Sequence, residues 1–176
     1  MSEPSGPDPL VRLAREAIEA YVRDRTVIKA PLMPDVEPRQ AGVFVCLHSK
    51  DSSLRGCIGT YLPTRRTIEE EIVGNAISAA TGDPRFLPVS GPELPDLDIS
   101  VDVLEAPEEV NGVEDRDPKV YGIIVRTDDG RQALLLPDLE GIDTPEMQLR
   151  VTCRKGGIDP DRDRYRIYRF RVTRHH

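Results

Sequence analysis

The sequence of 176 residues is poor in aromatic residues, cysteine and histidine, and each shortage excludes a class of protein. Phe, Trp and Tyr together make up 5% of the chain, and Trp is absent. The three cysteines are an odd number without a CxxC pair, which argues against a disulfide scaffold and a zinc cluster. Only His48 lies outside the terminal histidine pair, so we expect no histidine-rich metal site.

Membrane and nucleic-acid signals are also missing. No apolar run approaches the roughly 20 residues of a membrane-spanning helix. The acidic, proline-rich start MSEPSGPDP has neither the basic residues nor the apolar core of a signal peptide. We therefore expect a cytoplasmic protein without membrane contact. The net charge of −7 argues against general nucleic-acid binding. Because no phosphate-binding glycine loop occurs either, we expect no cofactor.

The chain does contain a regular series of helix and strand patterns. Apolar residues at three- and four-residue spacing predict helices over 9–23, 67–81 and 144–155. Apolar or alternating runs predict strands over 42–49, 54–61, 97–104, 121–126, 131–136 and 164–173. The hairpins among these strands imply antiparallel pairing, so we predict an α+β fold with mostly antiparallel sheets flanked by helices.

Three segments lie outside these patterns. Residues 105–118 are acidic and are predicted to form a loop. Residues 1–8 are expected to be a disordered leader that ends at Asp8, the predicted cap of the first helix. The terminal pair, residues 175–176, is interpreted as a remnant of a purification tag, with a native end as the alternative.

The least ordinary segment is LRGCIGT at residues 54–60. Two glycines inside a strand lose packing and backbone entropy, so Gly56 and Gly59 indicate close approach by another chain segment or by a ligand. In the second case their backbone N–H groups bind substrate and stabilise an oxyanion. In an extended segment Arg55 and Cys57 share one face, where a guanidinium favours the reactive thiolate.

The hairpin register extends this arrangement. A loop over 50–53 places Cys46 opposite Cys57 and His48 opposite Arg55, so that His48 lies diagonal to the Cys57 thiol. His48 then acts as the base and Cys46 as a resolving thiol. A loop one residue longer or shorter breaks these pairings. The alternative is that the cysteines are small apolar core residues and that His48 has a structural role.

Two further candidates follow LRGCIGT in the chain. Asn75 lies on the apolar stripe of the helix 67–81, where a buried amide must be hydrogen-bonded, either to a loop backbone or to a site residue. Arg85 lies in the segment DPRF, residues 83–86. Its guanidinium either pairs with Asp83 or binds an anionic substrate group, and Phe86 is expected to anchor the loop in the core.

LRGCIGT together with NAISAATGDPRF at residues 75–86 resembles the AMMECR family, and the similarity extends over about residues 10–173. The resemblance implies one AMMECR-type domain over 9–174, with two unequal lobes and a cleft near LRGCIG. It implies no settled activity. Bacterial relatives are encoded or fused with a Memo-type protein, which resembles non-haem iron dioxygenases, and with a radical SAM protein. These two proteins are therefore the implied partners.

Three functional hypotheses result. The leading one is a cysteine-dependent enzyme or enzyme subunit that acts on a small anionic substrate. Cys57 is its nucleophile or redox thiol, Arg55 lowers the pKa of that thiol, His48 is the base, and Arg85 holds the anion. The second is a non-catalytic binding module for a Memo-type or radical SAM partner. The third and weakest is RNA binding through the arginine-rich strand at 164–173.

Overall fold

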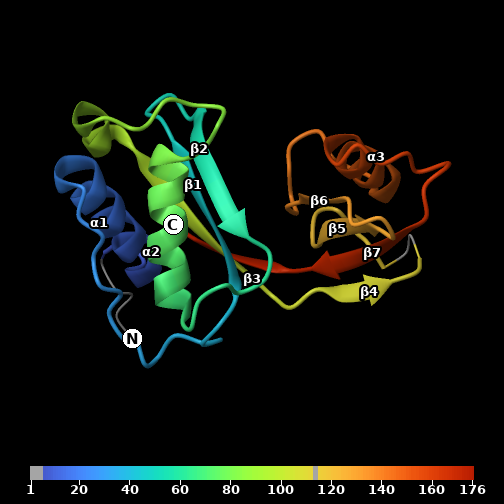
Figure 1. The fold of residues 1–176 in the computed structure, drawn as a ribbon, viewed down its shortest axis with the longest axis horizontal. Helices are drawn as coiled ribbons and strands as arrows, with labels where there is room; N and C mark the ends of the chain where they lie inside the picture. Colours follow the sequence, from blue (N-terminus) through green and yellow to red (C-terminus); the bar gives the residue numbers. More distant parts are fainter. Residues whose placement is uncertain (1–5, 113–114) are drawn as a thin grey trace. The chain divides into compact units, whose positions relative to one another are not determined.

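The fold is taken from a computed structural model, which describes residues 6–112 and 115–176 (Figure 1). The described chain contains helices and strands in this order: α1 (Pro9–Asp24), β1 (Gly42–His48), β2 (Leu54–Thr60), α2 (Ile68–Thr81), the 3-10 helix η1 (Gly91–Asp96), β3 (Asp98–Leu104), β4 (Glu108–Val110), β5 (Gly122–Thr127), β6 (Gln132–Leu135), α3 (Pro145–Lys155), β7 (Tyr165–Phe170) and β8 (Val172–His175). They form two compact units, Met1–Leu104 with Thr173–His176, called the first unit, and Glu105–Val172, called the second unit.

The first unit is built on a four-stranded sheet with the order β2-β1-β3-β8. β1 pairs antiparallel with both β2 and β3, and α1 and α2 pack beside each other against the sheet (Figure 1). The predicted cap of α1 is confirmed, because the Asp8 carboxylate accepts a hydrogen bond from the Leu10 N–H. The apolar core between helices and sheet includes Leu13, Ile18, Val43, Leu47, Ile68 and Ile72.

The second unit has its own four-stranded sheet, with the order β4-β7-β5-β6. Residues 128–130 form the turn between β5 and β6, where Gly130 has the positive φ of 88° that suits glycine. α3 packs on β5 and β6, and the small core beneath it contains Ile123, Val125, Cys153 and Ile158.

The antiparallel sheets and flanking helices confirm the predicted α+β class, but two element predictions are wrong. The acidic segment predicted as a loop contains the short strand β4, which pairs with β7. The single strand predicted over 164–173 is divided at Arg171 into β7 and β8, which belong to different sheets.

Two of the expectations concern the ends of the chain, the leader over 1–8 and the tag remnant at 175–176. Of the expected leader, residues 1–5 lie outside the described residues. Asp8 lies 2.8 Å from the ring nitrogen Nδ1 of His175, in the segment interpreted as a tag remnant. In the described part of the chain, no helix combines the length and apolar character that crossing a membrane requires.

Candidate functional site

Cys46 and Cys57 pair directly across the β1–β2 hairpin, as the sequence predicted. Their Cα atoms are 4.1 Å apart and their sulfur atoms form a disulfide. The Cys57 N–H donates to the Asp83 side chain and not to β1. Cys46 and Cys57 are thus a non-hydrogen-bonded pair, the type in which opposing side chains come closest. In this state Cys57 carries no free thiol.

The prediction that His48 lies opposite Arg55 is wrong. His48 pairs with Leu54, because the register shifts between Leu47 and His48. The turn that causes the shift is closed by the Ser49 N–H, which donates to the Ser53 carbonyl at 2.9 Å. His48 is still two residues from Cys46 on β1 and so remains diagonal to Cys57, but Leu54 and not Arg55 lies opposite it.

Side chains of the loop after α2 cover the outer edge of β2 at Cys57. The Asp83 carboxylate accepts the Cys57 N–H at 2.9 Å, and Nη2 of Arg85 donates to the Cys57 carbonyl at 3.3 Å. Arg85 also binds the carboxylate through Nε and Nη2, at 3.0 and 2.7 Å. Since β2 ends the sheet, the two side chains take the place of a neighbouring strand at this residue.

Asp83 and Arg85 differ in burial, and their ion pair strongly lowers the pKa of Asp83. The hydrogen bonds from the Arg85 guanidinium hold the pKa of Asp83 well below its usual range, although burial opposes the shift. Asp83 is 4% exposed, whereas the Arg85 side chain is 54% exposed. Of the two interpretations of Arg85, the structure shows the local pair with Asp83.

Arg55 forms an ion pair with Glu93 of η1, and no pattern in the sequence indicates this partner. Nε of Arg55 donates to Glu93 at 2.8 Å, and Nη1 donates to the Leu87 carbonyl at 2.9 Å. The Arg55 contact holds the pKa of Glu93 at about 2. The Ser-x-x-Glu spacing that starts at Ser90 signals the turn, but it does not reveal the ion pair. Nothing in these contacts directs the Arg55 charge at the Cys57 sulfur.

Phe86 does not anchor its loop in the core, contrary to the prediction. Its ring is half-buried, with the Arg85 guanidinium carbon 5.5 Å and the Arg55 guanidinium carbon 6.0 Å from the ring centre. The neighbouring Leu87 is 84% exposed. Arg85 of the DPRF segment and Arg55 of β2 therefore place two cations around the Phe86 ring.

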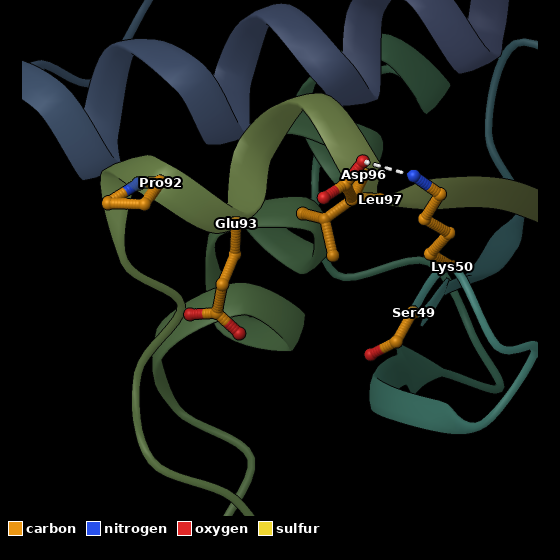
Figure 2. Close-up of a pocket in the computed structure, with 6 residues that line it drawn as sticks. All are labelled: Ser49, Lys50, Pro92, Glu93, Asp96 and Leu97. Atoms are coloured by element: carbon orange, nitrogen blue, oxygen red, sulfur yellow. Dashed lines mark ion pairs between the residues drawn. The ribbon is translucent and has the colours of Figure 1, made fainter.

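A hollow of about 270 Å³ lies beside Glu93, the residue that pairs with Arg55 (Figure 2). It is lined by Ser49, Lys50, Pro92, Glu93, Asp96 and Leu97. Lys50 and Asp96 form an ion pair of 3.9 Å across one side, and the Glu93 carboxylate lies on another. Because Glu93 is already bound to Arg55, this hollow presents no unpaired charge from that residue.

Internal packing accounts for both glycines of LRGCIGT. A Cβ atom at Gly56 would overlap the Ala79 carbonyl of α2, and one at Gly59 would overlap the Phe44 ring. Of the two explanations offered by the sequence, a neighbouring chain segment is thus the one that the structure shows. Neither glycine requires a ligand to explain it.

Asn75 is a buried amide that joins α2 to the sheet. Its Nδ2 donates to the Val43 carbonyl at 2.9 Å and to the Thr60 hydroxyl at 3.2 Å. The Thr60 hydroxyl in turn donates to Glu71, which also accepts the N–H and hydroxyl of Thr64. This places Asn75 in a structural network. No pattern in the sequence marks Glu71 as the centre of this network, since acidic residues in a first helical turn are explained by the helix dipole.

Burial alone would raise the pKa of Glu71, but the hydrogen bonds from Thr60 and Thr64 more than offset it and hold this pKa below its usual value. Within residues 6–112 and 115–176, no group of three or more His, Cys, Asp or Glu side chains is placed to hold a metal ion.

Comparison with known proteins gives consistent similarities. A family model described as AMMECR1 matches residues 11–175. A Thermotoga maritima protein is 50% identical over 172 residues, which cover 97% of this chain and 98% of that protein. A Clostridium acetobutylicum protein is 46% identical over 173 residues, 96% of this chain but 36% of that protein. The crystal structure of an uncharacterized protein from Pyrococcus horikoshii matches with a TM-score of 0.81 and 34% identity, over 94% of this chain and 88% of that one.

Proposed function

This chain belongs to the AMMECR1 family, and on that premise we propose that its LRGCIGT segment is a thiol–disulfide centre. Cys57 is the residue that exchanges disulfides with a small thiol compound. The observation that carries the proposal is the direct pairing of Cys46 with Cys57 and the disulfide between them. Cys46 is 9% exposed and Cys57 is half-buried, so an incoming thiolate reaches the Cys57 sulfur more easily.

The exchange proceeds in two balanced steps. The thiolate of the small compound attacks Sγ of Cys57, the sulfur–sulfur bond breaks, and Cys46 leaves as a thiolate that takes a proton from water. A second thiolate then attacks the small compound's sulfur in the mixed disulfide and releases the Cys57 thiolate. Two electrons pass from the two small thiols to the protein, and the small disulfide is the other product.

Arg85 favours a small thiol that carries a carboxylate. The guanidinium uses Nε and Nη2 for Asp83, which leaves Nη1 of this half-exposed side chain for a second anion. Arg85 also donates to the Cys57 carbonyl, so an anion bound there lies close to the reacting sulfur. His48 has no part in this scheme.

Site-resolved alkylation and mass spectrometry test the proposal. In the oxidised native protein we expect Cys46 and Cys57 to resist alkylation until a thiol is added. The Cys46→Ser variant should form a mixed disulfide at Cys57 with cystine faster than with cystamine, which lacks the carboxylate. Arg85→Gln in the same background should remove that difference. Cys153 is an internal control, because it is 1% exposed and burial raises the pKa of its thiol.

Two results would count against the exchange. One is full alkylation of Cys57 in the oxidised native protein before any thiol is added. The other is a mixed disulfide that forms at Cys153 as fast as at Cys57.

A second candidate function, docking of a Memo-type or radical SAM partner, is favoured by the 84% exposure of Leu87 beside the LRGCIGT strand. The Clostridium acetobutylicum relative supports it, since the matched region there is 36% of a longer protein. Leu87→Asp should abolish capture by a purified Memo-type protein, whereas Cys57→Ala should retain it; the opposite pattern would exclude this surface. Gly56→Val is unsuitable, because its side chain would collide with the Ala79 carbonyl.

We do not propose RNA binding as a function of this chain. The structure gives partners to arginines of the last two strands: Arg169 pairs with Glu108 at 2.6 Å and Arg174 with Asp102 at 2.8 Å. Arg171 lies over the Tyr121 ring, 5.1 Å from its centre. These contacts engage Arg169, Arg171 and Arg174 within the protein itself.

A further inference from the structure

A buried arginine lies in the second unit and forms no ion pair with any residue that the structure describes. Arg116 is 4% exposed, and its Nε donates to the Gly112 carbonyl at 3.0 Å. Its Nη1 is buried without a hydrogen-bond partner. Among the described residues no carboxylate forms an ion pair with it, whereas Arg131 of the same unit binds both Asp129 and Asp163.

Burying a guanidinium without a counter-charge lowers the stability of the fold. A buried charge is normally paired and fully hydrogen-bonded, because the protein interior does not replace the water that it loses. A buried donor without an acceptor is therefore a reason to look for a missing partner. The missing partner of Arg116 is an acceptor for Nη1, and the positive charge of the guanidinium favours an anion.

Arg116 lines a cavity of about 520 Å³, a volume in the range of small-molecule sites. The cavity lies where β4 ends at Val110 and β7 begins at Tyr165. Its lining consists of Glu109, Val110, Asn111, Arg116, Leu149, Tyr165, Arg166 and Ile167.

The lining combines positive charge with an apolar wall. Arg116 and Arg166 are its two cations and Glu109 its one anion, so the lining carries a net charge of +1. Asn111 and Tyr165 add polar side chains, and Val110, Leu149 and Ile167 add apolar surface. We propose that this cavity binds a small organic oxyanion, a carboxylate or phosphate group on an apolar body, and that Arg116 is its anion-binding residue.

The test is a titration of the whole chain, followed by backbone amide NMR shifts and by calorimetry, with benzoate, phenyl phosphate and benzamide. At least one of the two anions should bind saturably below about 20 mM and shift the amides of Asn111, Arg116 and Ile167. Benzamide has the same shape as benzoate without its charge and should bind about tenfold more weakly or worse. A preference for benzoate or for phenyl phosphate decides between a carboxylate and a phosphate ester.

Arg116→Met should weaken anion binding about 10- to 100-fold, while Arg154→Met, at an exposed arginine of α3 that does not line the cavity, should leave it unchanged. Should Arg116→Met fail to fold, Arg116→Lys is the second variant. It keeps the positive charge but lacks the paired N–H donors of the guanidinium, so it should bind the anions more weakly than wild type. The proposal is overturned if neither anion saturates, if the arginine variants bind equally, or if the shifts map outside the cavity.

Discussion

Asp83→Ala is the sharpest test of how the edge of β2 is closed. The substitution removes the acceptor of the Cys57 N–H and of the Arg85 N–H, Nε and Nη2. Hydrogen bonds to a charged group contribute about 1.5–3 kcal/mol each when buried. The half-exposed Arg85 guanidinium regains water and returns much of its share. We therefore expect the free energy of unfolding to fall by about 2–3 kcal/mol in total.

Because the chain has no Trp, urea unfolding is best followed by far-UV circular dichroism. With an m-value of about 2 kcal/mol/M, the midpoint should fall by about 1–1.5 M. Arg85→Ala should cost about 1 kcal/mol, and the double variant should resemble Asp83→Ala alone, since both changes break one network. Asp96→Ala is the matched control, because its 3.9 Å pair with Lys50 is exposed and should contribute at most about 0.5 kcal/mol. An Asp83→Ala loss no larger than this control would refute the account.

The pH dependence gives an independent check on the same residue. The pKa of Asp83 is lower in the folded chain than in the unfolded one, so its stabilising contribution is fully present above the unfolded value of about 3.9. The contribution is lost as the pH falls through the folded pKa. The stability difference between wild type and Asp83→Asn should therefore stay constant from about pH 7 to pH 5 and shrink below about pH 4.

Three further outcomes are expected. Reduction of the Cys46–Cys57 disulfide, whose residues are 11 apart in sequence, should lower the unfolding free energy by about 3 kcal/mol in urea melts; a Cys46→Ser variant that still responds to reductant would contradict this. Gly56→Ala should lower it by more than about 2 kcal/mol, because its Cβ meets a backbone oxygen of α2, while Gly91→Ala, which meets no atom within 4 Å, should be near neutral by the same assay. Glu71→Gln should lower the unfolding free energy by about 3 kcal/mol, because an amide cannot accept all the hydrogen bonds that this carboxylate accepts. A thermal melt that matches wild type would contradict the central place of Glu71 in this network.

The pairing of Cys46 with Cys57 could be predicted because strand alternation and a short polar turn define the centre of a hairpin. The residue that lies opposite His48 could not be predicted in the same way. The turn depends on Ser52, whose φ is 66°, and serine gives no sequence signal for this conformation. A single extra residue on β2 at the end of the hairpin was enough to put Leu54 opposite His48 in place of Arg55.

The remaining errors arise where tertiary contacts decide the local structure. β4 is three residues long and begins with Glu108 and Glu109, so it shows no apolar alternation, and its pairing with β7 makes it a strand. The break at Arg171 has neither Gly nor Pro to mark it. The pair of Arg55 with Glu93 joins residues 38 apart in sequence, which no local spacing reveals.

The position of β8 in the first sheet has a consequence for truncation of the chain. β8 follows the sheet and the helix of the second unit in the chain, so the first sheet ends at β3 until this last segment is in place. Until Arg174 arrives, Asp102 lacks the guanidinium that binds both of its oxygens, and β3 has an open edge. A variant truncated before β8 would expose that edge to other chains, although it would keep the apolar core residues of both units.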